Sequence, residues 1–229
     1  IGFIAPGRVP LRRDDNDFKG VAPAPGWDAR YDWQGWLPFD ALPRQQDPAS
    51  GFIATANQRI VPPDYPHYLA QDWALPYRYQ RIVQMIERQP KHSFDDIRAM
   101  HADVRSLAVG HLLPRLLRTK AEHPLFAAAQ KALAAFSGTM KPDSPAPLIY
   151  WSWLRHLSQR VLADELGQAL YERTLGTRGY FDAIDAVMAA DDALDRLDID
   201  VETRCLQLLA HTDAGAGIDL RFLGTAIKM

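Results

Sequence analysis

An informative segment of the chain reads Asp47-Pro48-Ala49-Ser50-Gly51-Phe52-Ile53-Ala54-Thr55-Ala56-Asn57. Pro48 and Gly51 are turn residues, and the apolar run from Phe52 to Ala56 that follows them is typical of a short strand. Asn57 comes directly after this run, and asparagine tolerates a left-handed backbone and caps its own turns. The segment therefore predicts a strand at 52–56 that presents an asparagine side chain at its end.

A second short strand is predicted at the start of the chain, from Gly2 to Ala5. The residues between the two strands are rich in turn formers and contain Trp27, Trp33 and Trp36. Two short strands that are so far apart in the sequence do not make a stable sheet by themselves. We therefore expect residues 1–65 to be a loop-rich segment whose strands belong to a larger sheet supplied by other chain segments.

The distribution of proline changes near residue 66. Ten of the 17 prolines fall in the first 66 residues, whereas the rest of the chain carries apolar residues at helical spacing. We expect residues 66–229 to form a helical segment. The predicted fold class is α+β, and this chain is expected to be mainly helical.

The first predicted helix begins at Pro76, because proline is well suited to the first turn of a helix. Behind it, an i, i+3, i+4, i+7 pattern of apolar residues forms one face of the helix, made by Tyr79, Ile82, Val83 and Ile86.

A second helix start is predicted at Ser93, which together with Asp96 resembles a capping box. The apolar positions that follow run as far as Val104 and Leu107, and Pro114 is expected to kink or end this helix. Further helices are predicted at residues 125–136, 150–171, 181–189 and 201–211.

The composition is that of an average globular domain and excludes several classes of protein. The chain has 229 residues, of which 47% are hydrophobic and 24% charged, with a net charge of -2. Lys and Arg are scattered, so nucleic acid is not an expected partner. No run approaches the roughly 20 apolar residues that a membrane span needs. The single cysteine, Cys205, excludes an internal disulfide and every zinc site built from several cysteines.

The 47–57 segment belongs to a longer set of motifs that resembles the penicillin acylase family of bacterial amide hydrolases. The same set contains Asp64-Tyr65-Pro66 and Trp73-Ala74-Leu75-Pro76-Tyr77-Arg78-Tyr79-Gln80-Arg81-Ile82. Gly7 to Arg12, Trp33 to Pro43 and Phe94 to Pro114 also contain residues that agree with it. The resemblance extends over most of residues 1–170. It implies an internal part of the large (β) subunit of an N-terminal-nucleophile hydrolase with an αββα fold.

The resemblance also implies a function and a catalytic group. Members of the family cleave linear amides of N-acylated small molecules, such as a β-lactam side-chain amide or an acyl homoserine lactone. Their nucleophile is a serine exposed by self-cleavage of a precursor, with its own α-amino group as the base. Ile1 has no hydroxyl group, so the serine is expected upstream, on another segment of the same precursor. A periplasmic or secreted bacterial enzyme is implied, and this chain by itself is expected to be inactive.

Two residues receive catalytic roles from the resemblance. Asn57 matches the asparagine whose side-chain amide helps to form the oxyanion hole, and Arg78 matches an arginine that lines the active site. A neutral N–H donor suits the first role, because negative charge develops on the carbonyl oxygen only in the transition state. An inward-facing arginine at a helix start needs a carboxylate, a carbonyl or a substrate for its donors. The alternatives are a turn residue at 57 and, at 78, either a structural ion pair or an arginine whose stem covers apolar surface while its guanidinium reaches water.

No cofactor is expected, and the evidence for a metal is weak. His67 and Asp72 flank the motif without a third ligand, which does not make a metal site. Some members of the family bind a structural calcium, but His67 stands where one of the calcium carboxylates is expected, which argues against calcium here. Trp33, Trp36 and Trp73 either line an acyl pocket or pack in the interior.

The competing interpretation is a stand-alone helical module that binds a partner or has a structural role and catalyses nothing. In that case Asn57 and Arg78 are parts of the scaffold. A third interpretation is a piece trimmed from the enzyme. The acyl and amine specificities are not predicted, because most pocket walls are expected to come from other segments.

Overall fold

The structure is a computed structural model that describes residues 1–175 and 183–184. The chain forms two compact units, of which the first is Ile1–Tyr79 and the second begins at Gln80. The boundary predicted from proline content after residue 65 remains a prediction. The predicted helices at 181–189 and 201–211, together with Cys205, lie outside the described residues apart from positions 183–184.

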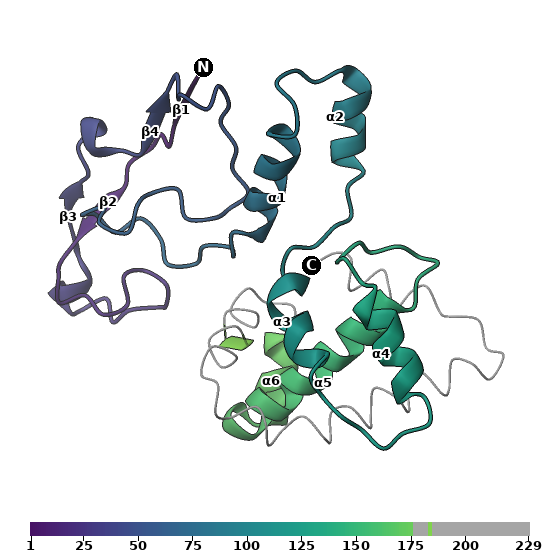
Figure 1. Cartoon of the computed structure of the whole chain (residues 1–229). Coiled ribbons are helices and arrows are strands. Elements are labelled where there is room, and N and C mark those ends of the chain that lie inside the picture. Colours follow the sequence, from purple (N-terminus) through teal and green to yellow (C-terminus); the bar gives the residue numbers. More distant parts are fainter. Residues whose placement is uncertain (176–182, 185–229) are drawn as a thin grey trace. The chain divides into compact units, whose positions relative to one another are not determined.

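The first unit contains two small antiparallel sheets. Strand β1 (Gly2–Ile4) pairs with β4 (Arg44–Gln46), and β2 (Pro10–Arg12) pairs with β3 (Trp33–Trp36) (Figure 1). Pro10 can stand in β2 because the first residue of a strand need not donate a hydrogen bond to the ladder. Two single-turn 3-10 helices complete this unit among the described residues, at Ala29–Tyr31 and Phe39–Ala41.

The strand predicted at 52–56 is not formed, so this prediction is wrong. The first predicted strand, Gly2 to Ala5, finds its partner at Arg44–Gln46 instead, and Ala5 continues the pairing by donating its N–H to the carbonyl of Pro43. The backbone of Ala56 is bound by side chains, not by a neighbouring strand. The region between the predicted strands is also less loop-like than expected, because it contains β2, β3 and β4.

The second unit is helical in its described part. Its helices are α2 (Phe94–His101), α3 (Val109–Leu116), α4 (Phe126–Ala134), α5 (Ala146–Leu166) and α6 (Gln168–Thr174), and it also holds most of α1 (Tyr77–Ile86) (Figure 1). Helix α1 begins at Tyr77, one residue after the start predicted at Pro76. Helix α4 likewise matches the prediction for residues 125–136.

Three predicted helix boundaries are wrong. Helix α2 starts with the predicted capping box at Ser93, but it ends at His101, before Val104 and Leu107. Pro114 ends no helix, since it lies inside α3, which begins at Val109. The single helix predicted at 150–171 begins earlier and is divided at Gly167, whose φ of 72° is outside the helical range.

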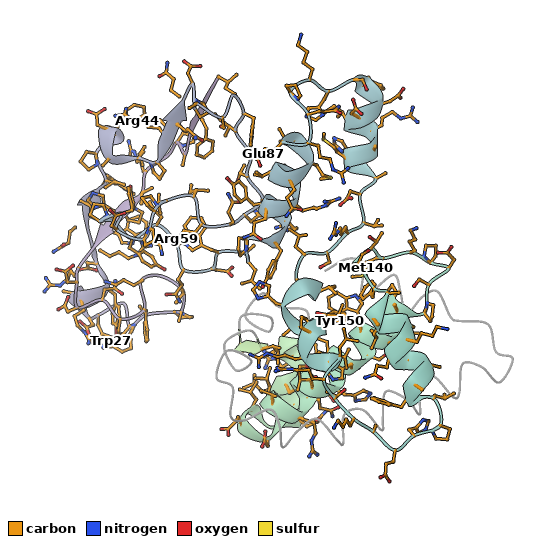
Figure 2. All side chains as sticks on the ribbon, viewed as in Figure 1. Trp27, Arg44, Arg59, Glu87, Met140 and Tyr150 are labelled. Atoms are coloured by element: carbon orange, nitrogen blue, oxygen red, sulfur yellow. The ribbon has the colours of Figure 1, made fainter. Side chains whose placement is uncertain are left out.

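The hydrophobic core of the second unit is built around α5. Tyr150, Trp153, Leu154 and Leu157 of this helix are each at most 1% exposed, and Figure 2 shows Tyr150 among the helices of this unit. Apolar residues of α3 and α4 belong to the same cluster, namely Val109, Leu112, Leu116, Ala129 and Leu133. At roughly 1.5–3 kcal/mol for each large apolar side chain buried, burial of this cluster stabilises the helical unit.

Among the described residues, no helix has the length and apolar character needed to cross a membrane.

Candidate active site

Asn57 stands at a tight turn in the first unit, and its side chain is exposed. Its φ angle is 65°, in the left-handed region that few non-glycine residues adopt. Asparagine is among the residues that adopt this conformation most readily, because its short polar side chain can hydrogen-bond locally. Asparagine is therefore a residue type that suits the left-handed backbone at position 57.

Four hydrogen bonds fix this turn. The Ala56 N–H donates to Oε1 of Gln58 at 2.7 Å, and the Ala74 N–H donates to the Asn57 carbonyl at 2.8 Å. The other two come from one atom, Nη2 of Arg78, which donates to the Ala56 carbonyl and to Oδ1 of Asn57, each at 2.8 Å. Backbone and side chain of the turn are thus restrained together.

Arg78 reaches the turn from the first turn of α1. The structure brings the two residues named from the sequence, Asn57 and Arg78, into direct contact. The guanidinium of Arg78 donates to the backbone carbonyl of Ala56 and to the side-chain oxygen of Asn57. Its acceptors are therefore a carbonyl and an amide oxygen, and not a carboxylate. Its side chain is exposed, so this contact lies at the surface of the described residues. The catalytic roles of the two residues remain predictions.

The contact decides which end of the Asn57 amide is available. Oδ1 accepts from the guanidinium, so the Nδ2 group, with its two N–H donors, faces away from Arg78. A fixed N–H donor beside a positive charge can stabilise negative charge that develops on a nearby oxygen atom. This arrangement suits an oxyanion site, because neither group has to lose a proton to act.

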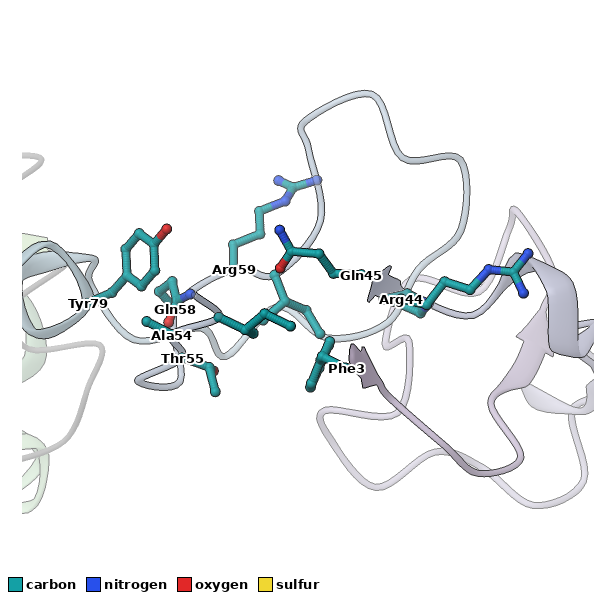
Figure 3. A pocket seen from close by; sticks show the side chains of 11 residues that line it. Phe3, Arg44, Gln45, Ala54, Thr55, Gln58, Arg59 and Tyr79 are labelled. Atoms are coloured by element: carbon teal, nitrogen blue, oxygen red, sulfur yellow. The ribbon is translucent and has the colours of Figure 1, made fainter. Parts of the chain in front are cut away.

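A pocket of about 380 Å³ lies in the same unit, next to the turn (Figure 3). It is lined in part by Gln58 and Tyr79, the residues that follow Asn57 and Arg78 in the sequence. The other lining residues come from β1, from β4 and the proline before it, and from the 53–60 segment; they are Phe3, Pro43, Arg44, Gln45, Ile53, Ala54, Thr55, Arg59 and Ile60. Gln58 was missed from the sequence, although a glutamine two residues after Ala56 is close enough to bind its backbone.

None of the tryptophans proposed for an acyl pocket lines this one. Trp33 and Trp36 pack against each other edge to face, with their ring centroids 5.3 Å apart. They remain 60% and 43% exposed. Neither of the two is therefore buried by packing within the described residues.

The flanking residues His67 and Asp72 do not form a metal site in the described part of the chain. His67 packs edge to face on Tyr65, with a centroid distance of 5.6 Å. Residues 1–175 and 183–184 contain no group of three His, Cys, Asp or Glu side chains that could hold a metal ion.

The fold is similar to that of a solved penicillin G acylase. The thermostable penicillin G acylase from Alcaligenes faecalis superposes with a TM-score of 0.58 at 21% identity, over 75% of this chain and 32% of that one. At this identity the match concerns the fold alone. The chain has the fold of a part of that acylase, a helix-rich α+β structure.

The sequence comparisons define the family. The model of the penicillin amidase family matches residues 1–216, and the chain belongs to this family. It is 39% identical over 164 residues to the penicillin acylase 2 proenzyme of a Pseudomonas species, covering 71% of this chain and 21% of the relative. It is 33% identical over 186 residues to the acyl-homoserine lactone acylase QuiP of Pseudomonas fluorescens, covering 73% and 22%. The chain thus spans about a fifth of the length of these relatives.

Proposed function

We propose that this chain carries the oxyanion-stabilising part of the active site of an amide hydrolase that cleaves linear amides of N-acylated small molecules. The observation that carries the proposal is the contact between Nη2 of Arg78 and Oδ1 of Asn57, at 2.8 Å, which leaves the amide donors of Asn57 available. Membership of the penicillin amidase family supports the same reaction class.

In the proposed reaction the nucleophile is a serine at the N-terminus of another segment of the same precursor, released by self-cleavage. Its hydroxyl oxygen attacks the amide carbonyl carbon while its α-amino group takes the proton. The carbonyl oxygen becomes negatively charged, and Nδ2 of Asn57 donates a hydrogen bond to it. The amine then leaves with the proton, and water hydrolyses the acyl ester. A periplasmic or secreted location belongs to this proposal.

The substrate class is an N-acyl compound with a small amine part. Among the relatives, one is named a penicillin acylase and another an acyl-homoserine lactone acylase, so both kinds of substrate belong in the assay. The turn acts on the carbonyl group that these amides share. The residues that surround the acyl chain and the amine would discriminate between the two kinds of substrate.

The test is Asn57→Ala in the full precursor, assayed with a penicillin and with an acyl homoserine lactone. We expect kcat to fall by about 10²–10³, because one oxyanion donor contributes about 3–4 kcal/mol to transition-state stabilisation. Gln80→Ala is the matched control: Gln80 is an exposed amide on α1 and is expected to leave kcat unchanged. An unchanged kcat in Asn57→Ala would remove the proposed role.

Intact mass and N-terminal sequencing distinguish the proposed hydrolase from a stand-alone helical module. The intact mass and N-terminal sequence of the mature protein should reveal a segment that begins with serine and comes from the same precursor. Absence of such a segment, together with no hydrolysis of either substrate, would favour a binding or structural module.

A further inference from the structure

The turn at Asn57 has an energetic cost that its surroundings must offset. A non-glycine residue in the left-handed region costs on the order of 1 kcal/mol or more, and it persists only where neighbouring contacts determine it. The φ of 65° at Asn57 is therefore evidence of restraint from the residues around it. The residues that bind this turn are Gln58, Ala74 and Arg78.

Gln58 makes the most local of these restraints. Its Oε1 accepts the Ala56 N–H at 2.7 Å, so the hydrogen bond joins the residue before Asn57 to the residue after it. The ring that it closes contains the whole backbone of Asn57. Ala74 and Arg78 also hold the turn, but they do so from residues 17 and 21 positions further along the chain.

Gln58 differs from Asn57 in its burial. It is 9% exposed, whereas Asn57 is exposed. Figure 3 shows Gln58 among the side chains that line the pocket, near Tyr79. Gln58 thus lines the pocket while its Oε1 holds the backbone of the turn.

We propose that Gln58 is a positioning residue for the oxyanion donor: it fixes the left-handed backbone of Asn57 and thereby the direction of the Nδ2 donors. The inference rests on the proposed function, since it gives Gln58 an effect on rate only through Asn57. Gln58 does not touch the reacting atoms, and its side chain takes or gives no proton.

The experiment compares Gln58→Met with wild type in the full precursor. Methionine keeps the length of the side chain and removes the amide oxygen. We expect kcat to fall about tenfold, the effect of losing one hydrogen bond of ordinary net strength, with KM changed less than about twofold. Gln46→Met is the matched control, because Gln46 is an exposed glutamine of β4 that does not line the pocket, and its kcat is expected to equal that of wild type.

A double-mutant cycle tests whether Gln58 acts through Asn57. In the Asn57→Ala background, Gln58→Met is expected to cause no further loss, because the donor that it positions is already gone. An equal tenfold loss in both backgrounds would show a general structural effect and overturn the inference, while the proposed function stands. No loss of kcat in Asn57→Ala alone would overturn the proposed function, and the inference with it.

Amide hydrogen exchange of wild type keeps the inference testable if Gln58→Met does not fold. The Ala56 N–H is expected to exchange at least about tenfold more slowly than an unprotected amide, since Gln58 occupies it. Exchange at the unprotected rate would mean that the ring is open in solution and would refute the positioning role.

Discussion

Replacement of Asp103 by Asn tests how the helical unit is held together. Arg81, on α1, donates from Nε and Nη2 to the two carboxylate oxygens of Asp103 at 2.8 and 2.6 Å. The two side chains are only 11% and 20% exposed, so this pair is screened less than an ordinary surface pair. Asp103 also accepts the Arg105 N–H at 3.3 Å, which fixes the segment after α2.

The loss of unfolding free energy expected for Asp103→Asn lies between two limits. Exposed ion pairs contribute about 0.2–1 kcal/mol, whereas breaking a buried pair costs about 3–5 kcal/mol. Asn keeps one oxygen acceptor for Arg81, so we expect Asp103→Asn to lower the free energy of unfolding by about 2 kcal/mol. Urea denaturation followed by circular dichroism measures the change. Asp95→Asn is the control, because the Asp95 side chain is 87% exposed and its pair with Arg98 is long, at 3.4 Å.

The same ion pair predicts a dependence on pH. Hydrogen bonding from Arg81 lowers the pKa of Asp103 below its usual value of 3.8. A carboxyl group whose pKa is lower in the folded state contributes its full stabilisation above the unfolded pKa and loses it as the pH falls through the folded pKa. The difference between wild type and Asp103→Asn should therefore be constant above about pH 5 and shrink below pH 4. A difference under 0.5 kcal/mol at neutral pH would refute the reasoning.

Substitutions at three further positions probe the local structure of the helical unit by the same denaturation assay. Gly138→Ala should lower the free energy of unfolding by at least about 2 kcal/mol, because φ is 85° and the new Cβ would lie 2.5 Å from the Ser106 carbonyl oxygen. Gly110→Ala, inside α3 with open space at the Cβ position, should instead raise it by about 0.5–1 kcal/mol, and the same sign at both glycines would contradict this account. Ser93→Ala should cost about 1 kcal/mol by removing the cap of α2, with Ser93→Thr retaining most of it.

The starts of α1 and α2 were predictable because their signals are local. Pro76 and the Ser93 cap act on residues within one turn, and both precede helices as expected. The end of α2 was not predictable in this way. After His101 the chain pairs with a distant segment, through the Arg105–Thr139 bridge and the bond from the Ser106 N–H to the Gly138 carbonyl. Helical periodicity contains no information about a partner more than 30 residues away.

The absence of a strand at 52–56 has a similar cause. The apolar run fits a strand, but the N–H and C=O of Ala56 are occupied by the side chains of Gln58 and Arg78. Family resemblance named Asn57 and Arg78 as functional residues, and the structure adds how they meet. Spacing in the sequence could not have predicted a hydrogen bond between residues 21 positions apart.

The bonds that hold Asn57 all begin and end between positions 56 and 78, inside the unit that ends at Tyr79. Short loops are closed at a small entropic cost, so this segment needs few remote contacts to reach its geometry. The segment from position 56 to position 78 therefore contains all of these contacts, which orient the Asn57 amide. Recombination or redesign that exchanges the helices beyond α1 can alter stability and neighbouring surfaces while the asparagine amide keeps its orientation.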